Sequence, residues 1–356
     1  MRHLRVYLDW NATAPLRQEA RDAMIAAMDV VGNPSSVHSE GRVAKALVER
    51  ARAQVADLAG CDPQDIAFTS SATEAAQMWF AGKSDLTGAE IEHDAVIAQI
   101  EACAGSEIIP VDPDGQIIWD KNAPLSTLQV ANSETGVLQS VVKRRPIGMV
   151  DATQVIGKVP FDFSEAYAQA AICSGHKFGG PKGAAALILG KGVEIENALG
   201  GGQEMGRRSG TENVIGLAGF GAAAQAAKRD LDAGIWAEID KLRNILEKAL
   251  AESVKETIFV GNRSARLPNT SCFLTPGWKG ETQVMQMDLA GFAVSAGSAC
   301  SSGKVRASRV LRAMGFSDQE ASCALRVSIG PSTTEDQVLR FAEAWTAAYK
   351  RHAARR

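Results

Sequence analysis

The sequence has little of several features that would define other classes of protein. None of its apolar runs approaches the ~20 residues that a membrane-spanning helix needs, and residues 1–7 lead into strand-like sequence without the apolar core of a secretion signal. Its six cysteines form no C-x-x-C pair and no cysteine–histidine spacing of a zinc site. We therefore expect a cytoplasmic protein that contacts no membrane and holds no metal.

Charge and glycine patterns exclude further classes. The 38 basic and 41 acidic residues give a formal net charge of −3, which leaves no broad basic face for a nucleic acid. The glycine-rich segments 179–183 and 200–206 have neither the G-x-G-x-x-G spacing of a dinucleotide site nor the G-K-[ST] ending of a P-loop. Neither a nucleic acid partner nor a bound NAD or ATP is expected.

What the chain does contain is an alternation of apolar, strand-like runs with amphipathic helical segments, which is typical of an α/β protein. Helical spacing over residues 17–31 places Met28 and Val31 on one apolar face with Ala20. A second helix is predicted over residues 38–59. Strands of a mostly parallel sheet flanked by helices are predicted at residues 66–69, 108–111, 125–131, 147–151, 170–174 and 184–189.

A break in the helical pattern at residues 231–234 predicts a domain boundary. A chain of 356 residues is long enough for one large core and a second, smaller one. Residues 12–230 are expected to form the large domain. Residues 231–356, together with residues 1–11, are expected to form a smaller α+β domain, with strands near 258–260, 270–274 and 325–329 and helices near 305–314 and 334–350.

Two polar segments that follow apolar runs indicate pyridoxal phosphate. Asp151 and Lys177 each come after such a run and so belong at the carboxyl ends of buried strands, where open α/β sheets bind ligands. Pyridoxal phosphate needs a lysine for covalent attachment and an acidic partner that keeps its ring nitrogen protonated. Each residue alone fits a loop lysine or a helix cap better, but the combination with Gln154, Ser174 and His176 favours the cofactor.

The segment at residues 70–74 places serine and threonine before an alanine-rich helix start. A helix N-terminus presents free backbone N–H groups and the positive end of the helix dipole, so it is a natural seat for the cofactor phosphate. Taken alone, such a segment is more often only a capping box.

Cys300 lies in a stretch of small residues, 295–303, that cannot pack a core. We expect a mobile loop, which suits a thiol that must travel to a cofactor, although a plain loop with an incidental cysteine is the alternative. The remaining cysteines are expected to be inert or buried thiols: Cys61, Cys103, Cys173, Cys272 and Cys323.

In combination these motifs resemble the cysteine desulfurases of the nitrogenase and iron–sulfur-cluster type, a part of the class V aminotransferase group of fold type I pyridoxal-phosphate enzymes. The resemblance runs nearly end to end, from residues 7–15 (YLDWNATAP) through 32–38 (GNPSSVH) to 325–330 (LRVSIG). It implies the fold type I architecture, pyridoxal 5'-phosphate as cofactor, L-cysteine as substrate and a homodimer.

The resemblance also implies roles for the cofactor-binding residues that match the family's motifs. Lys177 is expected to hold the cofactor, Asp151 to pair with its ring nitrogen and Gln154 to bond its phenolic oxygen. His93 is expected to stack on the ring and to shuttle protons. Phosphate contacts are implied for Ala72, Thr73, Ser174 and His176, and for Thr211 reaching into the neighbouring subunit.

The expected reaction uses two further residues. Arg326 matches the arginine that clamps the substrate carboxylate, a task that suits a bidentate guanidinium. Cys300 is expected to attack the substrate sulfur as a thiolate, so that alanine leaves and a persulfide remains for a sulfur-acceptor or scaffold protein in iron–sulfur cluster or related biosynthesis.

The sequence departs from the family's pattern in three places. Ser133 stands where the family's Asn-Asn-Glu-x-Gly has a second asparagine, and we expect it near the substrate. The segments 139–150 and 80–93 are shorter than in relatives, and Pro146 argues against a helix in the first. These departures keep two alternatives open: another pyridoxal-phosphate reaction, such as selenocysteine lyase or aminotransferase chemistry, and a non-catalytic subunit of a sulfur-transfer complex.

Overall fold

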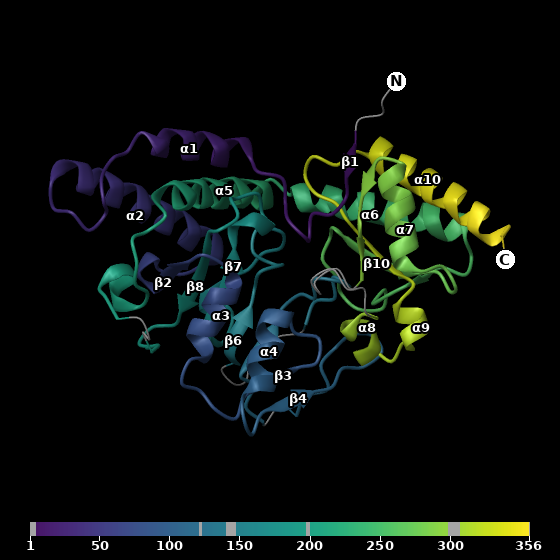
Figure 1. Cartoon of the computed structure of the whole chain (residues 1–356), viewed down its shortest axis with the longest axis horizontal. Helices are drawn as coiled ribbons and strands as arrows, with labels where there is room; N and C mark the ends of the chain where they lie inside the picture. The colour runs from purple at the N-terminus through teal and green to yellow at the C-terminus, as the bar shows by residue number, and fades with distance from the viewer. Residues whose placement is uncertain (1–4, 121–122, 140–146, 197–199, 298–306, 356) are drawn as a thin grey trace.

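The protein folds into two lobes that lie side by side (Figure 1). The computed structural model describes residues 5–120, 123–139, 147–196, 200–297 and 307–355. The first lobe contains α1 to α5 around a central sheet, and the second contains α6, α7 and α10 around a smaller sheet (Figure 1). Within those residues, no helix combines the length and the apolar composition that crossing a membrane requires.

The central sheet has five strands in the order β2-β8-β7-β6-β5. Only β8 runs against its neighbours, whereas β5, β6 and β7 are parallel and β2 points the same way. The carboxyl ends of these four strands therefore share one edge, and the prediction of a mostly parallel sheet is confirmed. The strands are β2 (Ile66–Thr69), β5 (Thr127–Gln129), β6 (Ile147–Asp151), β7 (Ala168–Ser174) and β8 (Ala185–Leu189).

Helices cover both faces of this sheet, and the apolar residues of β7 show why both faces must be covered. Ala171 and Cys173 belong to the core shared with α2 and α5, while Ala170 and Ile172 belong to the core shared with α3 and α4. Successive residues of a strand point to opposite faces, so one apolar run serves both cores. The helices are α1 (Gln18–Met28), α2 (Ser39–Ala59), α3 (Ala72–Phe80), α4 (Asp94–Ala102) and α5 (Val214–Asp232).

Two short parallel strands extend the sheet beyond β5. They are β3 (Thr87–Ala89) and β4 (Glu107–Ile109), and the backbone N–H of Ser126 donates to Thr87 O beside β5. The short 3-10 helices are η1 (Pro63–Asp65), η2 (Phe163–Glu165), η3 (Gly175–Lys177) and η4 (Gln203–Gly206).

The prediction for the first helix was wrong at its C-terminal end. The helix stops at Met28 rather than Val31, and Val31 is 92% exposed. Met28 is also exposed, because the contact with α5 buries only the side of α1 that carries Ala20 and Ala27. An apolar surface therefore remains at the end of α1.

The second lobe has its own core, which contains Trp278, Phe341 and Trp345 together with Leu8 from the N-terminal segment. Its antiparallel sheet has the order β12-β13-β10-β9, and β1 pairs in parallel with β11. The separate core supports the division near residue 230, which stays a prediction. The strands are β1 (Val6–Tyr7), β9 (Ile258–Phe259), β10 (Thr270–Leu274), β11 (Phe292–Ala293), β12 (Ser295–Ala296) and β13 (Ala324–Ser328).

The helices of this lobe begin after a backbone reversal at Gly234, whose φ of +71° is a left-handed value that favours glycine. They are α6 (Ile235–Ser253), α7 (Gly280–Leu289), α8 (Arg309–Ala313), α9 (Asp318–Ala321) and α10 (Glu335–Ala353).

Candidate functional site

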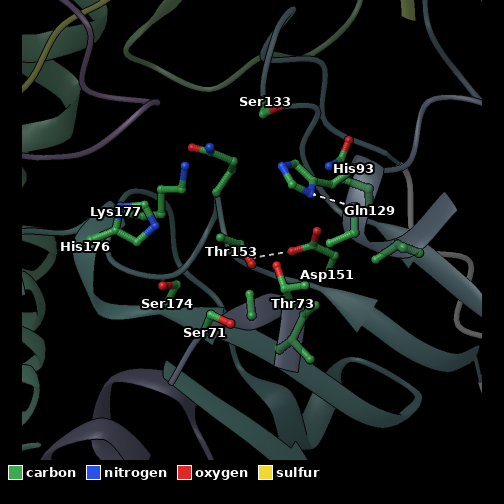
Figure 2. Close-up of a pocket in the computed structure, with 15 residues that line it drawn as sticks. Ser71, Thr73, His93, Gln129, Ser133, Asp151, Thr153, Ser174, His176 and Lys177 are labelled. Carbon is green, nitrogen blue, oxygen red and sulfur yellow. Dashed lines mark hydrogen bonds between the residues drawn. The ribbon is translucent and has the colours of Figure 1, made fainter. Parts of the chain in front are cut away.

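A cavity of about 270 Å³ lies at the edge of the central sheet where the parallel strands end (Figure 2). It brings together the predicted residues Ala72, Thr73, His93, Ser133, Asp151, Gln154, Ser174, His176 and Lys177. Its lining also includes Ser71, from the predicted phosphate segment 70–74, and residues that sequence reasoning did not single out: Ala95, Val96, Gln129, Thr153 and Ile172.

Asp151 is the last residue of β6 and is buried at the cavity wall. Its Oδ1 accepts a hydrogen bond from the backbone N–H of Thr153 at 2.9 Å, which fixes the carboxylate (Figure 2). Gln129 occupies the equivalent position at the end of β5, and its Oε1 accepts from Asn132 Nδ2 at 3.0 Å. The strand-end rule that identified Asp151 could also have found Gln129.

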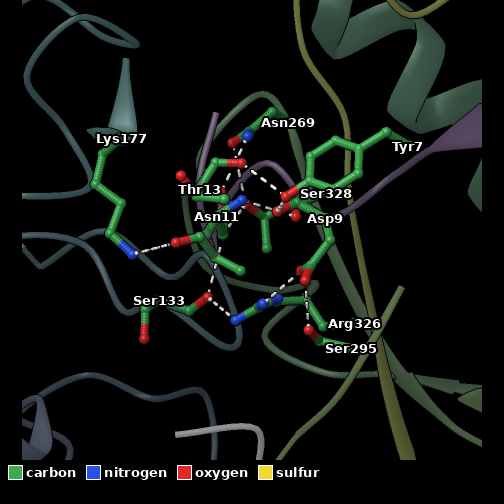
Figure 3. A network of polar contacts seen from close by, with 12 residues as sticks. Tyr7, Asp9, Asn11, Thr13, Ser133, Lys177, Asn269, Ser295, Arg326 and Ser328 are labelled. Atoms are coloured by element: carbon green, nitrogen blue, oxygen red, sulfur yellow. Dashed lines mark hydrogen bonds and ion pairs between the residues drawn. The ribbon is translucent and has the colours of Figure 1, made fainter. Parts of the chain in front are cut away.

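Lys177 ends the short helix η3, which follows β7 directly. Its Nζ donates to the backbone oxygens of Asn11 at 2.7 Å and of Ala12 at 3.0 Å. Figure 3 shows Lys177 extending toward Asn11 of the N-terminal segment. The amine is therefore positioned by main-chain acceptors of a segment that pairs with the second lobe.

The N-terminus of α3 forms one end of the cavity. Ser71 caps the helix by accepting from the N–H of Glu74 at 3.1 Å, and Ala72 and Thr73 follow in the first turn. Nearby, Thr153 Oγ1 and His176 Nδ1 are buried without a hydrogen-bond partner among the residues that the structure describes. Buried polar atoms in native proteins are normally hydrogen-bonded, so this donor set fits a phosphate group bound at the helix end.

His176 is held in its neutral form. Burial, followed by the positive charges of Lys177, Lys182 and Lys158, lowers the pKa of His176 to about 4. A neutral imidazole carries one N–H donor, which is enough for one oxygen of a bound anion.

His93 caps the N-terminus of α4 and lies across the cavity from Lys177 (Figure 2). Its Nδ1 accepts from the N–H of Ala95 at 3.1 Å. Arg309, at the start of α8, donates to the backbone oxygen of Glu92 at 2.7 Å, to Asp94 Oδ1 at 3.1 Å and to the backbone oxygen of Glu90. The turn that carries His93 is thus held on both sides by one guanidinium.

Arg326 does not line the cavity but lies directly behind it. Its Nη1 donates to the backbone oxygen of Ser133 at 3.1 Å, and its Nη2 pairs with Asp9 Oδ1 at 2.7 Å (Figure 3). Thr211 is exposed and lies outside the cavity lining. Cys300 falls outside the residues that the structure describes, as does the predicted loss of helix around Pro146.

Sequence reasoning missed two residues, Asn11 and Lys158, that form hydrogen bonds with the residues of the site. Asn11 donates through Nδ2 to the oxygen of Ser133 at 3.2 Å and to Thr270 Oγ1 at 2.8 Å. Lys158 is buried behind Gln154 and donates to its Oε1. The segment D-W-N-A-T at residues 9–13 gave no signal of this role for Asn11, since its partners lie far away in the sequence.

Comparison with known proteins finds relatives that match nearly the whole chain. Residues 6–341 match the family described as Aminotransferase class-V. The chain is 37% identical to a cysteine desulfurase of Cereibacter sphaeroides over 95% of its own length and 94% of the relative's. It is 34% identical to the cysteine desulfurase IscS of Dictyoglomus turgidum, covering 94% and 91% of the two chains. The crystal structure of a NifS-like protein from Rickettsia africae superimposes with a TM-score of 0.89 at 32% identity, over 97% of this chain and 99% of that one.

Proposed function

The chain belongs to the aminotransferase class-V family and, within it, to the cysteine desulfurases, and we propose that it converts L-cysteine to L-alanine and keeps the sulfur as a persulfide on Cys300. It is a pyridoxal-phosphate-dependent enzyme, and its fold is that of the NifS-like proteins. The observation that carries the proposal is the cavity in which a lysine, a strand-end aspartate and a helix N-terminus converge.

The residues present fit pyridoxal phosphate. Lys177 would attach it, Asp151 would bond its ring nitrogen and Gln154 its phenolic oxygen. The first turn of α3, with Thr153 and His176, would take the phosphate. When bound, the cofactor acts as an electron sink that stabilises negative charge at the substrate's carbon atoms.

The chain's own groups supply the proton transfers and the substrate contacts. Lys177 and His93 reach the cavity from two sides and would move protons to and from the substrate. The guanidinium of Arg326 lies next to Ser133 and would take up the substrate carboxylate there.

The reaction balances without an outside oxidant. The carbon–sulfur bond of L-cysteine breaks, its electron pair stays with the carbon, and that carbon takes a proton to give L-alanine. The sulfur forms a bond with the thiolate of Cys300, which becomes a persulfide. A sulfur-acceptor or scaffold protein would then receive that sulfur for iron–sulfur cluster or related biosynthesis.

The test is to incubate the purified protein with L-cysteine, added cofactor and a reductant, and to measure alanine and sulfide together. Equal amounts of both support the proposal. Lys177→Ala and Cys300→Ser should each abolish the reaction, while Cys103→Ser, which changes a thiol outside the cavity, should not. Alanine formation that survives Cys300→Ser would point to a selenocysteine-lyase-type reaction, a keto acid formed in place of alanine would point to transamination, and a protein that binds no cofactor would act as a non-catalytic subunit.

We also propose a homodimer in which Thr211 contacts the cofactor phosphate of the partner subunit. Thr211 is exposed and does not line the cavity of its own subunit, which supports a role in trans. Large apolar side chains are exposed around α1 and the start of α2, and they would be covered by a second copy: Ile25, Met28, Val31, Val37 and Val43.

Mixing inactive variants tests this arrangement. In a hybrid of Lys177→Ala and Thr211→Ala subunits, one of the two sites receives both native residues, so activity should return on mixing after mild dissociation. Sedimentation should give a dimer. A monomer, or no recovery in a hybrid of proven composition, would contradict the proposal.

We place the enzyme in the cytoplasm. Free thiols and persulfides persist where glutathione and thioredoxin keep cysteines reduced. Five described cysteines are unpaired, and burial raises the pKa of Cys61, Cys173 and Cys272 to about 12, which supports inert thiols at those positions. Cell fractionation tests this placement.

A further inference from the structure

Lys158 is a lysine with only 1% of its surface exposed, in the turns that follow β6 behind the cavity. Its Nζ lies 2.5 Å from Gln154 Oε1 and 3.1 Å from Asn11 Oδ1. Burial, together with the charges of Lys177 and Arg326, lowers the pKa of Lys158 well below its usual range. The N–H groups of this amine donate to both amide oxygens.

Backbone carbonyls determine which end of each amide faces Lys158. Gln154 Nε2 donates to the backbone oxygen of Asn11 at 3.0 Å, and Asn11 Nδ2 donates to the backbone oxygen of Ser133 at 3.2 Å. A carbonyl oxygen only accepts hydrogen bonds, so each amide turns its nitrogen toward the carbonyl and its oxygen toward Lys158. The second N–H of Gln154 then remains for a group bound in the cavity that Gln154 lines.

We propose that Lys158 is a positioning residue, which locks the side-chain amide of Gln154 so that its nitrogen, not its oxygen, faces the phenolic oxygen of the cofactor. The inference rests on the proposed function, since that oxygen belongs to pyridoxal phosphate. Without the N–H of Lys158, Gln154 Oε1 loses its partner and the amide gains freedom to rotate. A rotated amide presents an acceptor to an acceptor, which repels the bound group.

The hydrogen bonds of Lys158 also affect Lys177, because Asn11 contacts both lysines. The backbone oxygen of Asn11 accepts from both Gln154 Nε2 and Lys177 Nζ, the latter at 2.7 Å. The side chain of Asn11 is held in turn by Asn269 Nδ2 at 3.1 Å, in the network of Figure 3. Lys158 therefore fixes the amide and the segment on which the cofactor lysine rests, without touching the cofactor itself.

A double-mutant cycle separates this role from a purely structural one. The variants are Lys158→Met, Gln154→Ala and the two combined, and the readouts are the dissociation constant of pyridoxal phosphate and the absorption spectrum of the bound cofactor. Lys158→Met should weaken binding about tenfold, the effect of losing one hydrogen-bonded donor in a buried site, and should shift the absorption maximum. In the Gln154→Ala background, adding Lys158→Met should change both readouts much less, because only the contact with Asn11 is left to lose.

Two controls keep the test decisive. Lys228→Met removes a lysine that is paired with Asp232 on the outer surface of α5 and should behave as the wild type. Lys158→Gln keeps an N–H donor next to Gln154 and should retain more affinity than Lys158→Met; it also serves if the methionine variant fails to fold.

Several outcomes would overturn the inference. It falls if Lys158→Met weakens binding equally in both backgrounds, if it has no effect in either, or if Lys158→Gln and Lys158→Met are equivalent. The cycle does not depend on turnover. A wild-type protein that binds the cofactor with the expected coupling but makes no alanine would refute the proposed desulfurase activity and leave the role of Lys158 intact, whereas a wild type that binds no cofactor would refute both.

Discussion

Asp9 and Arg326 form a largely buried ion pair behind the cavity, with 2.7 Å between Asp9 Oδ1 and Arg326 Nη2. Ser295 Oγ donates to the other carboxylate oxygen of Asp9 at 2.8 Å. The guanidinium is only 3% exposed, so Asp9 supplies the negative charge that its burial requires. A substrate carboxylate that reaches Arg326 must share the guanidinium with Asp9.

Asp9→Asn should lower the free energy of unfolding by about 3 kcal/mol, because it leaves a buried guanidinium without an anion. The double variant Asp9→Asn, Arg326→Gln should lose less than the single variant, since no buried charge is left unpaired. Urea unfolding of the cofactor-free protein measures both. The exposed pair Asp336 and Arg340 on α10 is the control, and its neutralisation should cost under about 1 kcal/mol. If the losses of unfolding free energy caused by Asp9→Asn and by Arg326→Gln simply add in the double variant, Asp9 and Arg326 are not energetically coupled.

Thr153→Val should separate cofactor binding from stability. The hydroxyl of Thr153 is buried without a partner in the described part of the chain, so its removal breaks no internal hydrogen bond. The melting temperature of the cofactor-free variant should stay at or above that of the wild type. Its affinity for pyridoxal phosphate should fall about fivefold, if the hydroxyl serves the phosphate. Fluorescence titration checks the affinity, and Thr346→Val, which removes another unpartnered hydroxyl far from the cavity, should leave it unchanged.

Glu92 should make the cofactor-free protein less stable as the pH rises. Burial, reinforced by the charge of Asp151, raises the pKa of Glu92 from 4.5 to about 8. Between these values the folded state retains a proton that the unfolded state releases, so stability is present at low pH and is lost as the pH rises toward 8. Glu92→Gln cannot ionise, and its stability should decline less between about pH 5 and pH 8 than that of the wild type.

Urea midpoints across that pH range measure the difference. Glu107→Gln, at an exposed position in β4, should follow the wild-type curve. Parallel curves for Glu92→Gln and the wild type would mean that Glu92 is ionised in the folded protein.

Arg309→Ala should loosen the turn that carries His93. One guanidinium holds the backbone of this turn and Asp94 at the same time, so its loss frees the segment without removing His93. Amide hydrogen exchange around residues 90–95 should accelerate about tenfold, and kcat for alanine formation should fall with it. Arg312→Ala, one turn further along α8, is the matched control and should alter neither. Unchanged exchange in Arg309→Ala would show that α4 alone holds the turn.

The sequence predicted the bounds of an element correctly where the local pattern of residues is sufficient to identify that element. The strands at 66–69, 147–151 and 270–274 have their predicted bounds, because apolar β-branched runs flanked by polar residues have few alternatives in an α/β chain. Asp151 and Lys177 could be assigned to the sheet edge for the same reason.

The sequence failed as a guide where a partner lies far away along the chain. Asp9 is separated from Arg326 by 317 positions, and the pair exists only because the N-terminal segment adds itself to the second lobe. Lys158 gave no signal because a lysine is rarely buried, and only the fold shows the two oxygens that receive it. Met28 and Val31 were wrongly predicted to lie on a buried face of α1, because helical spacing alone does not show which apolar residues pack against another element.

The position of Asn11 sets the order in which a newly made chain can complete its site. Asn11 is synthesised well before two of its partners, because its backbone N–H donates to Ser328 Oγ and its side chain donates to Thr270 Oγ1. The carbonyl that receives Lys177 therefore cannot be held in place until β10 and β13 have been synthesised. Cofactor capture therefore requires β13, and a chain truncated before β13 would carry every cavity residue without the strand that holds Asn11, whose carbonyl orients the lysine.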